Sequence, residues 1–508
     1  MSVARTWAVA LTGVDGALVE VEADLTNQLP GFKIIGLADK ALGEAVQRVH
    51  NACANSGLPL PRRALTINLS PASLPKQGSG FDLAVAITAL ATELTVDTGS
   101  IARTVHIGEL GLDGRLRPIA GVLPAVRAAA AHGFHRVVVP WANMDEARLV
   151  DGIEVHGAVS LADVARLHGA ELDPDDRPVD PVASTAPADE PEQVPDLAEV
   201  IGQREAVDAL IVAAAGGHHL LMCGPPGAGK TMLARRLPGI LPELDDEQAL
   251  AAASIRSLAG LQVTSLSRLP PFEAPHHSAS VAALVGGGSR GVRPGAIARA
   301  SEGVLFLDEA GEFPANALDA LRQPLESGSI VIHRAGGAAR FPARFQLVLA
   351  TNPCPCGDYG IRGGSCMCPP SAIRRYLGRL SGPLLDRIDI QLTLARVAHT
   401  APASAGPTTA AAHGRVLEAR ARTAHRLRDT PWQRNAHVDG TWLRQGPLAP
   451  APAVRRPLDA ALHRGVLTLR GYDRVLRVAW SLADLGGRSQ LGVDDIGRAL
   501  FLKKGITS

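Results

Sequence analysis

The chain has 508 residues, enough for two to four domains that each bury a core. Its formal net charge is +1, which excludes binding of nucleic acid through overall charge, so any such surface has to be local. Aromatic residues make up only 3% of the chain, which argues against stacking platforms for bases. No apolar run is long enough to span a membrane and the N-terminus lacks a secretory pattern, so we expect a cytoplasmic protein.

Residues 1–172 show alternating strand and helix patterns. Periodicity predicts helices over Ala41–Asn55 and Asp82–Glu93 and a short strand over Ala64–Leu69. The segment Val126–Pro140 predicts a helix, a glycine stop and a buried strand. We therefore expect an N-terminal α/β domain.

Part of this domain resembles the proteolytic domain of Lon proteases, on the ribosomal-S5-like fold. The resemblance rests on Gly108–Ala131 and on Pro75–Leu83, the stretch in which that family carries a nucleophilic serine activated by lysine. Ser79 is the candidate serine, but the place of the lysine falls at Val122–Leu123, which cannot take a proton. Lys76 lies in the wrong motif, so we expect a non-proteolytic relative. A generic α/β domain is the alternative.

Residues 173–195 predict a linker to a central domain of residues 196–395. The segment is rich in Asp, Glu and Pro and has few apolar residues to bury.

The most specific pattern in the chain is Leu220–Thr231, LLMCGPPGAGKT. An apolar run ends in G-x-x-x-x-G-K-[ST], a loop whose backbone N–H groups cradle phosphates, and which therefore needs glycine where the chain turns. Lys230 would reach the β- and γ-phosphates and Thr231 would ligate Mg²⁺. Val200 and Ile201 are candidates for an apolar adenine slot, with core packing as the alternative. The predicted phosphate-binding residues are Gly224, Pro225, Pro226, Gly227, Ala228, Gly229, Lys230 and Thr231.

Two further strands end in polar residues. GVLFLDE, residues 303–309, predicts a buried parallel strand followed by two acids. Asp308 would hold Mg²⁺ and Glu309 would polarise the attacking water, at the sheet edge where ligands bind in open α/β folds. Asn352 follows a strand predicted over Phe345–Ala350 and could orient water against the γ-phosphate.

These motifs, together with LLDR at residues 384–387, follow the order and spacing of AAA+ ATPases. Four stretches resemble the magnesium-chelatase-like YifB/ComM family, which also carries a Lon-like N-terminal domain. The resemblance implies an α/β chain with an AAA+ P-loop core on a parallel sheet and a C-terminal helical lid of residues 396–508. The four stretches are APHHSAS (Ala274–Ser280), VGGGSRGVRPG (Val285–Gly295), NPCPCG (Asn352–Gly357) and SGPLLDRIDIQL (Ser381–Leu392).

The resemblance also implies roles for single residues. Asn352 matches the first sensor, Arg387 matches the arginine finger that enters the neighbouring subunit's site, and Arg470 matches the second sensor. A finger that acts in trans requires a ring, and the family implies a homo-hexamer. Two departures stand out: Ala296 replaces an acid that members usually carry, and Arg474 competes with Arg470 for the sensor role.

Two insertions carry arginines. The first lies within residues 242–300, and the second, Ser329–Ala343, predicts a β-hairpin with a turn at Gly336–Gly337. The resemblance makes both face the pore of a ring, where arginines could follow a phosphate backbone without reading sequence. A structural hairpin with solvated arginines is the alternative. The DNA-contact candidates are Arg290, Arg293, Arg334 and Arg340.

Four cysteines cluster in a loop rich in glycine and proline. Four thiolates suit structural zinc, although C-x-C spacing is less usual than C-x₂-C, and four reduced free thiols are the alternative. We expect Cys53 and Cys223 to be small buried residues, and adjacent His276 and His277 to make packing or loop contacts. The four candidate zinc ligands are Cys354, Cys356, Cys366 and Cys368.

The C-terminal segment predicts a small helical lid. Helices are expected over Val416–Leu427, Leu458–Arg464, Leu467–Leu485 and Val493–Leu500, after a loop or linker over Val397–Gly414.

We therefore expect an ATP- and Mg²⁺-dependent ring motor that acts on DNA, of helicase or branch-migration type, in recombination or natural transformation. A chelatase-type motor that remodels a protein partner is the alternative. The missing lysine argues against an ATP-dependent protease, and Glu309 with Arg387 argues against a protein that uses ATP only as a switch.

Overall fold

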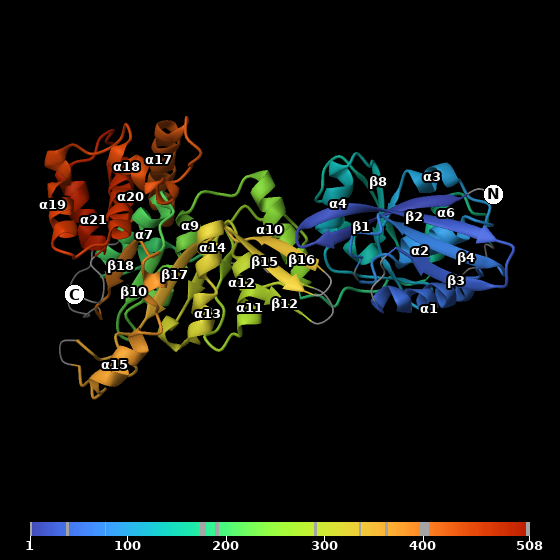
Figure 1. The fold of residues 1–508 in the computed structure, drawn as a ribbon, viewed down its shortest axis with the longest axis horizontal. Coiled ribbons are helices and arrows are strands. Elements are labelled where there is room, and N and C mark those ends of the chain that lie inside the picture. The colour runs from blue at the N-terminus through green and yellow to red at the C-terminus, as the bar shows by residue number, and fades with distance from the viewer. Residues whose placement is uncertain are drawn as a thin grey trace.

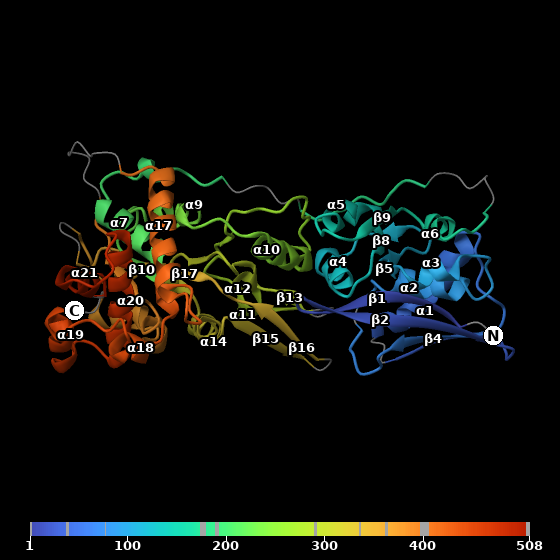
Figure 2. The same ribbon diagram turned by 90° about the horizontal axis from the view of Figure 1, so that it is seen from above.

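The computed structural model describes residues 3–36, 40–76, 78–172, 179–187, 193–288, 292–334, 337–360, 364–396 and 406–503. Figures 1 and 2 show an elongated molecule with the N-terminal domain at one end, a second sheet in the middle and the C-terminal helices at the other end. No helix in the described parts of the chain is long and apolar enough to cross a membrane.

The N-terminal domain is built on a seven-stranded mixed sheet of order β3-β4-β2-β1-β5-β8-β9. Its strands β1 and β2 form a long antiparallel hairpin that the sequence did not predict, with Gly13 in the left-handed region next to the turn. The strands are β1 (Ala4–Thr12), β2 (Asp15–Thr26), β3 (Gly31–Ile35), β4 (Ala64–Ser70), β5 (Val105–His106), β8 (Arg136–Pro140) and β9 (Glu154–Ala158), beside a small ribbon of β6 (Glu109–Leu110) and β7 (Leu116–Arg117).

Helices cover this sheet, and those expected from periodicity are confirmed. Every residue of α2 is buried, as its apolar composition requires. Glycines with left-handed backbone, Gly121 and Gly133, flank α4, and Ser160 and Asp163 form a capping box on α6. The helices are α1 (Lys40–Asn55), α2 (Asp82–Leu90), α3 (Thr98–Ala102), α4 (Val122–Ala131), α5 (Met144–Ala147) and α6 (Leu161–Leu167).

The central domain contains a five-stranded sheet of order β11-β14-β17-β10-β18, in which all neighbours are parallel. Every residue of β10, β14 and β17 is buried, which confirms the prediction of buried parallel strands. The strands are β10 (Leu220–Cys223), β11 (Phe272–Glu273), β14 (Val304–Leu307), β17 (Gln346–Thr351) and β18 (Ile390–Thr393).

Helices and two insertions surround the central sheet. The predicted hairpin forms as β15 (Ser329–Arg334) and β16 (Gly337–Pro342). Of its predicted turn at Gly336–Gly337, Gly336 lies outside the described residues and Gly337 begins β16. The other insertion contains α11 (Val281–Val285) and the strands β12 (Gly286–Gly287) and β13 (Arg293–Pro294). The helices of the domain are α7 (Arg204–Gly216), α8 (Lys230–Ala234), α9 (Leu237–Ile240), α10 (Asp246–Ala259), α12 (Ala296–Arg299), α13 (Ala315–Asp319), α14 (Arg322–Ser327), α15 (Pro370–Leu377) and α16 (Gly382–Leu385).

The C-terminal region is helical, as predicted. The expected loop over Val397–Gly414 is wrong at its end, because α17 begins at Thr409. The Thr408 side chain accepts a hydrogen bond from the backbone N–H of Ala411, and a run of alanines favours helix from there. Residues 397–405 lie outside the described residues. The helices are α17 (Thr409–Leu427), α18 (Gly440–Gln445), α19 (Pro452–His463), α20 (Leu469–Leu485) and α21 (Val493–Lys503).

The N-terminal domain packs directly on the two insertion regions of the central domain. The backbone N–H of Gly121 donates to the carbonyl of Ser257 on α10 at 3.2 Å, and Gly13 bridges to Arg340 on the hairpin. Apolar side chains of α4 and α10 share one buried cluster. In the predicted linker 173–195, the described residues 179–187 and 193–195 form neither helix nor strand.

Candidate nucleotide site

The phosphate-loop sequence turns at the carboxyl edge of the central sheet, between β10 and α8. Gly227 and Gly229 have φ angles of 78° and 86°, in the left-handed region that favours glycine. A Cβ on Gly224 would lie 2.7 Å from the carbonyl oxygen of Leu394, so this position does not admit a side chain. The glycine spacing of the motif therefore has a steric cause at each of these positions.

Lys230 and Asn352 meet at this edge because β17 lies between β10 and β14 in the sheet. The buried Nζ of Lys230 donates to the carbonyl oxygens of Gly224 and Pro225 at 2.6 and 3.0 Å, and to Asn352 Oδ1 at 2.9 Å. Burial lowers the pKa of Lys230, and the nearby carboxylate of Asp308 opposes that shift.

Thr231 and Asp308 form the second part of the site. The Thr231 hydroxyl donates to Asp308 Oδ2 at 2.5 Å, which joins the start of α8 to the end of β14. Hydroxyl and carboxylate oxygens are the ligands that Mg²⁺ prefers. With an ammonium group and glycine-bounded backbone beside them, these residues fit the magnesium ion and phosphates of a bound nucleotide.

Glu309 has a strained backbone and a histidine partner. Its φ of 51° lies in the left-handed region, which is uncommon for a residue with a side chain, and its side chain is 51% exposed. His277 Nδ1 lies 3.0 Å from Glu309 Oε2, while His276 contacts Ser278. The loop contacts expected of this pair are present, but nothing in the sequence pointed to Glu309 as the partner of His277.

The two residues predicted to line an adenine slot differ in exposure. Val200 is buried in the core shared by the central domain and the C-terminal helices, whereas Ile201 is 60% exposed. Core packing therefore describes Val200, and Ile201 is the one of the pair whose side chain can meet a ligand.

Arg387 precedes β18, whereas the phosphate loop follows its parallel neighbour β10, so the two lie at opposite ends of the sheet. Arg387 follows α16, its Nη1 donates to the carbonyl oxygen of Pro383 at 2.5 Å, and it forms an ion pair with Glu326 on α14. Burial lowers the pKa of Arg387, and the positive charges of Arg322 and Arg470 lower it further.

Arg474 has a buried counter-charge, unlike Arg470. Its Nη1 donates to Asp389 Oδ1 at 2.6 Å, and the second oxygen of Asp389 accepts from the backbone N–H of His219 at 3.1 Å. Burial alone would raise the pKa of Asp389, but Arg474 and His218 hold it well below its ordinary value. Arg470 is exposed.

The DNA-contact candidates are dispersed over the insertion regions. Arg293 and Arg340 are exposed where the central domain meets the N-terminal domain. Arg290 lies outside the described residues, as does the side chain of Arg334. Ala296, at the position where an acid is usual, is buried in the first turn of α12.

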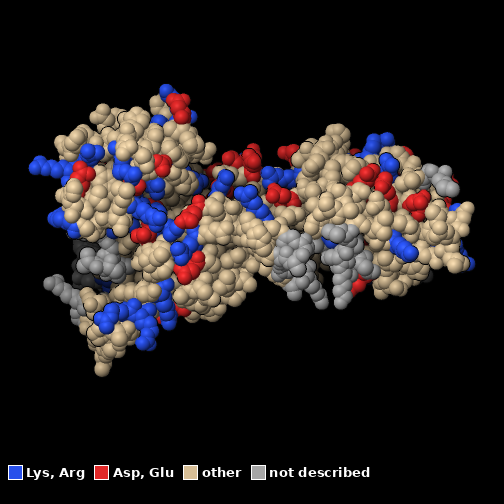
Figure 3. All heavy atoms as spheres, viewed as in Figure 1, with Lys and Arg blue, Asp and Glu red and all other residues tan. Residues whose placement is uncertain are grey.

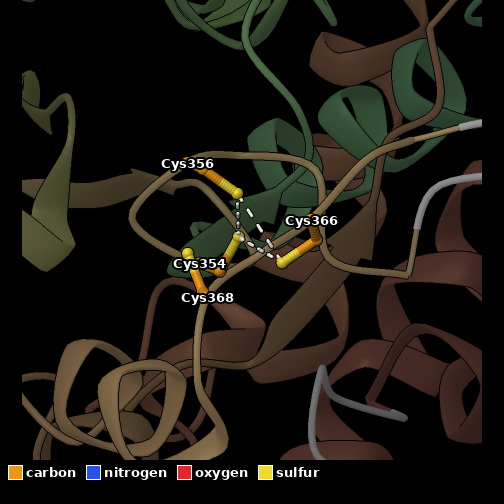
Figure 4. A group of neighbouring side chains, drawn as sticks. All are labelled: Cys354, Cys356, Cys366 and Cys368. Atoms are coloured by element: carbon orange, nitrogen blue, oxygen red, sulfur yellow. Dashed lines mark hydrogen bonds between the residues drawn. The ribbon is translucent and has the colours of Figure 1, made fainter.

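Figure 4 shows the four clustered cysteines converging from two sides of one loop. Their sulfur atoms all lie within 4.8 Å of one another, and Cys354 Sγ is 3.3 Å from Cys356 Sγ and 3.7 Å from Cys366 Sγ. A tetrahedral zinc ion with bonds of about 2.3 Å separates its sulfur ligands by about 3.8 Å. The cluster, completed by Cys368, therefore has the dimensions of a four-thiolate metal site.

The remaining cysteines, Cys53 and Cys223, are buried and free, as expected. Burial raises their pKa values to about 12 and about 11, which keeps both as unreactive thiols.

The candidate serine of the N-terminal domain has no lysine partner among the described residues. Ser79 donates to Glu109, and both line a cavity of ≈ 680 Å³ at the boundary with the central domain. Lys76 is buried, and its Nζ donates to the carbonyl oxygens of Gly36, Leu69 and Pro71. Val122 and Leu123 are fully buried.

The sequence did not point to several charged residues that the fold brings together. Glu326 and Asp389 each form an ion pair with an arginine that is distant in sequence. No local sequence pattern indicates such contacts. A basic surface on α15 is also new: Figure 3 shows Lys and Arg gathered over the place where Figure 1 labels this helix. Arg374 and Arg375 are exposed there. The RR pair at residues 374–375 is the signal that could have identified it.

Comparison with known proteins agrees with this geometry. The model described as magnesium chelatase, subunit ChlI, matches residues 196–401, that of subunit ChlI of Mg-chelatase matches 21–143, and that of the ChlI C-terminal part matches 406–503. An uncharacterised protein of Mycobacterium tuberculosis is 48% identical over 99% of both chains. Competence protein ComM of Haemophilus influenzae is 40% identical over 98% of this chain and 97% of its own. The uncharacterised protein YifB of Escherichia coli is 39% identical over 96% and 94%.

A phosphate loop on a parallel sheet, an acidic strand end beside it and a helical C-terminal region define a magnesium-chelatase-like AAA+ ATPase. Within that class, the relatives that match nearly the whole chain identify the family. The chain belongs to the YifB/ComM family, as its sequence motifs indicated.

Proposed function

We propose that this chain is one subunit of a ring, a homo-hexamer, that uses ATP hydrolysis to move DNA. The observation that carries the ring is the placement of Arg387. Its side chain contacts Pro383 and Glu326 before the start of β18, at the opposite end of the parallel sheet from the phosphate loop. A finger at that end of the sheet serves a nucleotide held by an adjacent copy, so each site is complete only between two subunits.

The site residues would share the chemistry of hydrolysis. Lys230 would bind the β- and γ-phosphates, and Thr231 with Asp308 would hold Mg²⁺, which neutralises charge and aligns the phosphates. Glu309 would polarise the attacking water, with Asn352 orienting it. Arg387 would bind the γ-phosphate and stabilise the additional charge that develops on it in the transition state.

The same reasoning assigns the second sensor to Arg470. Because Arg474 already neutralises Asp389 in a buried pair, Arg470 is the arginine of α20 that is exposed and available to a phosphate. Its positive charge acts on Arg387, so we propose that both arginines serve the same nucleotide of a neighbouring subunit.

DNA as the substrate is supported by the 40% identity to competence protein ComM and by the exposed Arg293 and Arg340 on the insertion regions. Arginines on such elements bind phosphates without reading sequence, which suits helicase or branch-migration activity. The chelatase-type alternative, in which the motor remodels a partner protein, is supported by the magnesium chelatase family models. A cytoplasmic location remains a prediction.

The ATPase rate with single-stranded, duplex and four-way DNA tests the substrate. Strong stimulation by DNA supports the proposal, and stimulation only by a protein partner supports the alternative. Glu309→Gln should bind ATP without turnover, and Lys230→Ala should not bind it. Arg387→Ala should assemble without hydrolysing, and mixing it with Lys230→Ala subunits should restore activity. Full-rate hydrolysis by a subunit that stays monomeric with saturating ATP would refute the ring.

We also propose that the four-cysteine cluster holds structural zinc. The loop around it has many glycines and prolines and little apolar surface, so four metal bonds would supply its order. Metal analysis of protein purified without chelator should find one zinc per chain. Cys366→Ser with Cys368→Ser should abolish it, and a metal-free wild-type protein with full ATPase activity would refute the site.

For the N-terminal domain we propose a non-proteolytic role. Ser79 pairs with Glu109, a carboxylate that accepts its proton only weakly at neutral pH, and the one lysine nearby in sequence is occupied by three carbonyl oxygens. Peptide hydrolysis that survives in Lys230→Ala but is lost in Ser79→Ala would contradict this.

A further inference from the structure

Arg387 is enclosed within its own subunit. Its side chain is only 12% exposed, one terminal nitrogen donates to Pro383, and the other pairs with Glu326. The third nitrogen, Nε, is buried and has no hydrogen-bond partner among the described residues. A guanidinium in this state cannot reach a phosphate on another subunit without leaving Glu326.

The position of Glu326 allows it to break the ion pair with Arg387. The Glu326 side chain is 63% exposed, at the last turn of α14, so it can turn into water at little cost. The backbone of Arg387 is less free to move, because its N–H donates to the carbonyl oxygen of Leu384 at 2.9 Å in the short segment after α16. The pair therefore opens from the glutamate side.

Other positive charges act on this pair. Arg322 is exposed one turn before Glu326 on the same helix, and the charge of the exposed Arg470 also acts on Arg387. Neither has an ion-pair partner among the described residues, and the charge of Arg474 is already balanced by Asp389. Glu326 thus pairs with Arg387 close to cations that have no ion-pair partner of their own, and an anion of higher charge can compete with it.

We propose that Glu326 is a positioning residue that retains Arg387 in its own subunit until a neighbour's nucleoside triphosphate displaces it. This inference rests on the proposed function of Arg387 as a finger in trans. The triphosphate offers the guanidinium several charged oxygens, which form stronger hydrogen bonds than one exposed carboxylate. It also repels Glu326, so arrival of nucleotide and release of the finger favour each other.

The exchange predicts a kinetic signature. Every nucleotide that engages Arg387 has to overcome the Glu326 pair, which raises the ATP concentration needed for half-maximal rate but not the rate at saturation. An ion pair with one exposed partner corresponds to a factor of up to about five in an equilibrium constant. Removing the carboxylate charge should lower the KM for ATP by up to about five-fold.

The test compares steady-state ATPase rates of full-length wild type, Glu326→Gln and the double variant Glu326→Gln/Arg387→Ala, over ATP and protein concentration. Glu418→Gln is the matched control, because Glu418 is similarly exposed and pairs with an arginine on the remote helix α17. We expect a lower KM with little change in kcat for Glu326→Gln, no change for Glu418→Gln, and an inactive double variant. Glu326→Ala, as a second truncation, should behave like Glu326→Gln.

Two results would overturn the inference. One is a KM in Glu326→Gln and Glu326→Ala equal to or above that of wild type, with unchanged thermal unfolding. The other is a double variant that keeps both activity and the lowered KM, because the effect would then not pass through Arg387. Failure of the finger itself looks different: Arg387→Ala alone would then hydrolyse ATP at the wild-type rate.

Discussion

Gly13 joins the N-terminal domain to the hairpin of the central domain, and replacing it with alanine tests that junction. A Cβ at Gly13 would lie 2.0 Å from the carbonyl oxygen of Arg340 and 2.9 Å from its carbonyl carbon. These are backbone atoms, so no rotamer change can make room, and the hairpin has to withdraw by about 1 Å. The left-handed backbone at φ 71° adds a strain of about 1 kcal/mol for alanine.

Gly57 provides the matched control. It has the same φ of 71°, but a Cβ there would meet nothing within 4 Å. Gly57→Ala should therefore cost only the backbone strain of about 1 kcal/mol, whereas Gly13→Ala should cost about 2–4 kcal/mol, because overpacking typically adds 1–3 kcal/mol. Thermal unfolding of the full chain measures both, and limited proteolysis should cleave Gly13→Ala faster near the junction. Equal destabilisation by the two substitutions would show that the close contact does not hold the domains together.

Three further predictions concern buried and half-buried charges. Asp389→Asn leaves Arg474 without a counter-charge and should lower the free energy of unfolding, measured with denaturant, by about 3–5 kcal/mol. The double variant Asp389→Leu/Arg474→Met should recover most of this stability. A loss of less than about 1 kcal/mol in Asp389→Asn would contradict the reasoning. His277→Ala removes the partner of Glu309 and should lower kcat about two- to five-fold at unchanged stability, and an unchanged kcat would exclude a positioning role. Burial lowers the pKa of His168 to about 4, so as pH falls below about 6.5 this histidine takes up a proton in the unfolded chain before it does so in the folded one. The free energy of unfolding should therefore decrease by about 3 kcal/mol toward pH 4. In His168→Asn, thermal unfolding should depend less on pH by this amount, and an equal pH dependence in the two proteins would refute the prediction.

The parts of the fold that the sequence predicted are those fixed by local patterns. The phosphate loop was visible because glycines are needed where the backbone turns left-handed, and buried strands such as β14 were visible as apolar runs. The hairpin of β1 and β2 was missed, since its exposed face breaks the apolar run and only pairing across the sheet defines it. The start of α17 was missed because its capping threonine follows a segment rich in proline and alanine.

In the candidate site, too, the sequence predicted the residues that follow local patterns but not their tertiary partners. Lys230, Thr231, Asp308 and Asn352 could be predicted because parallel strands end at one edge, which brings their flanking residues together whatever lies between them in sequence. The partners of charged groups could not be predicted, because Glu326 on α14 and Arg387 after α16 are far apart in sequence and meet only in the folded chain. Contacts of this kind depend on tertiary geometry alone and correspond to no periodic pattern in the sequence.

The buried pair of Asp389 and Arg474 has a consequence for how the proposed finger and second sensor move. Arg387 precedes Asp389 by two residues, and Arg470 precedes Arg474 by about one turn of α20. Opening a buried ion pair leaves two unbalanced charges and is costly, so the end of the central sheet and the start of α20 behave as one rigid unit. On the proposed roles, any rotation of the C-terminal helices driven by nucleotide carries both arginines together. The neighbouring site would then gain or lose its two cations in a single step.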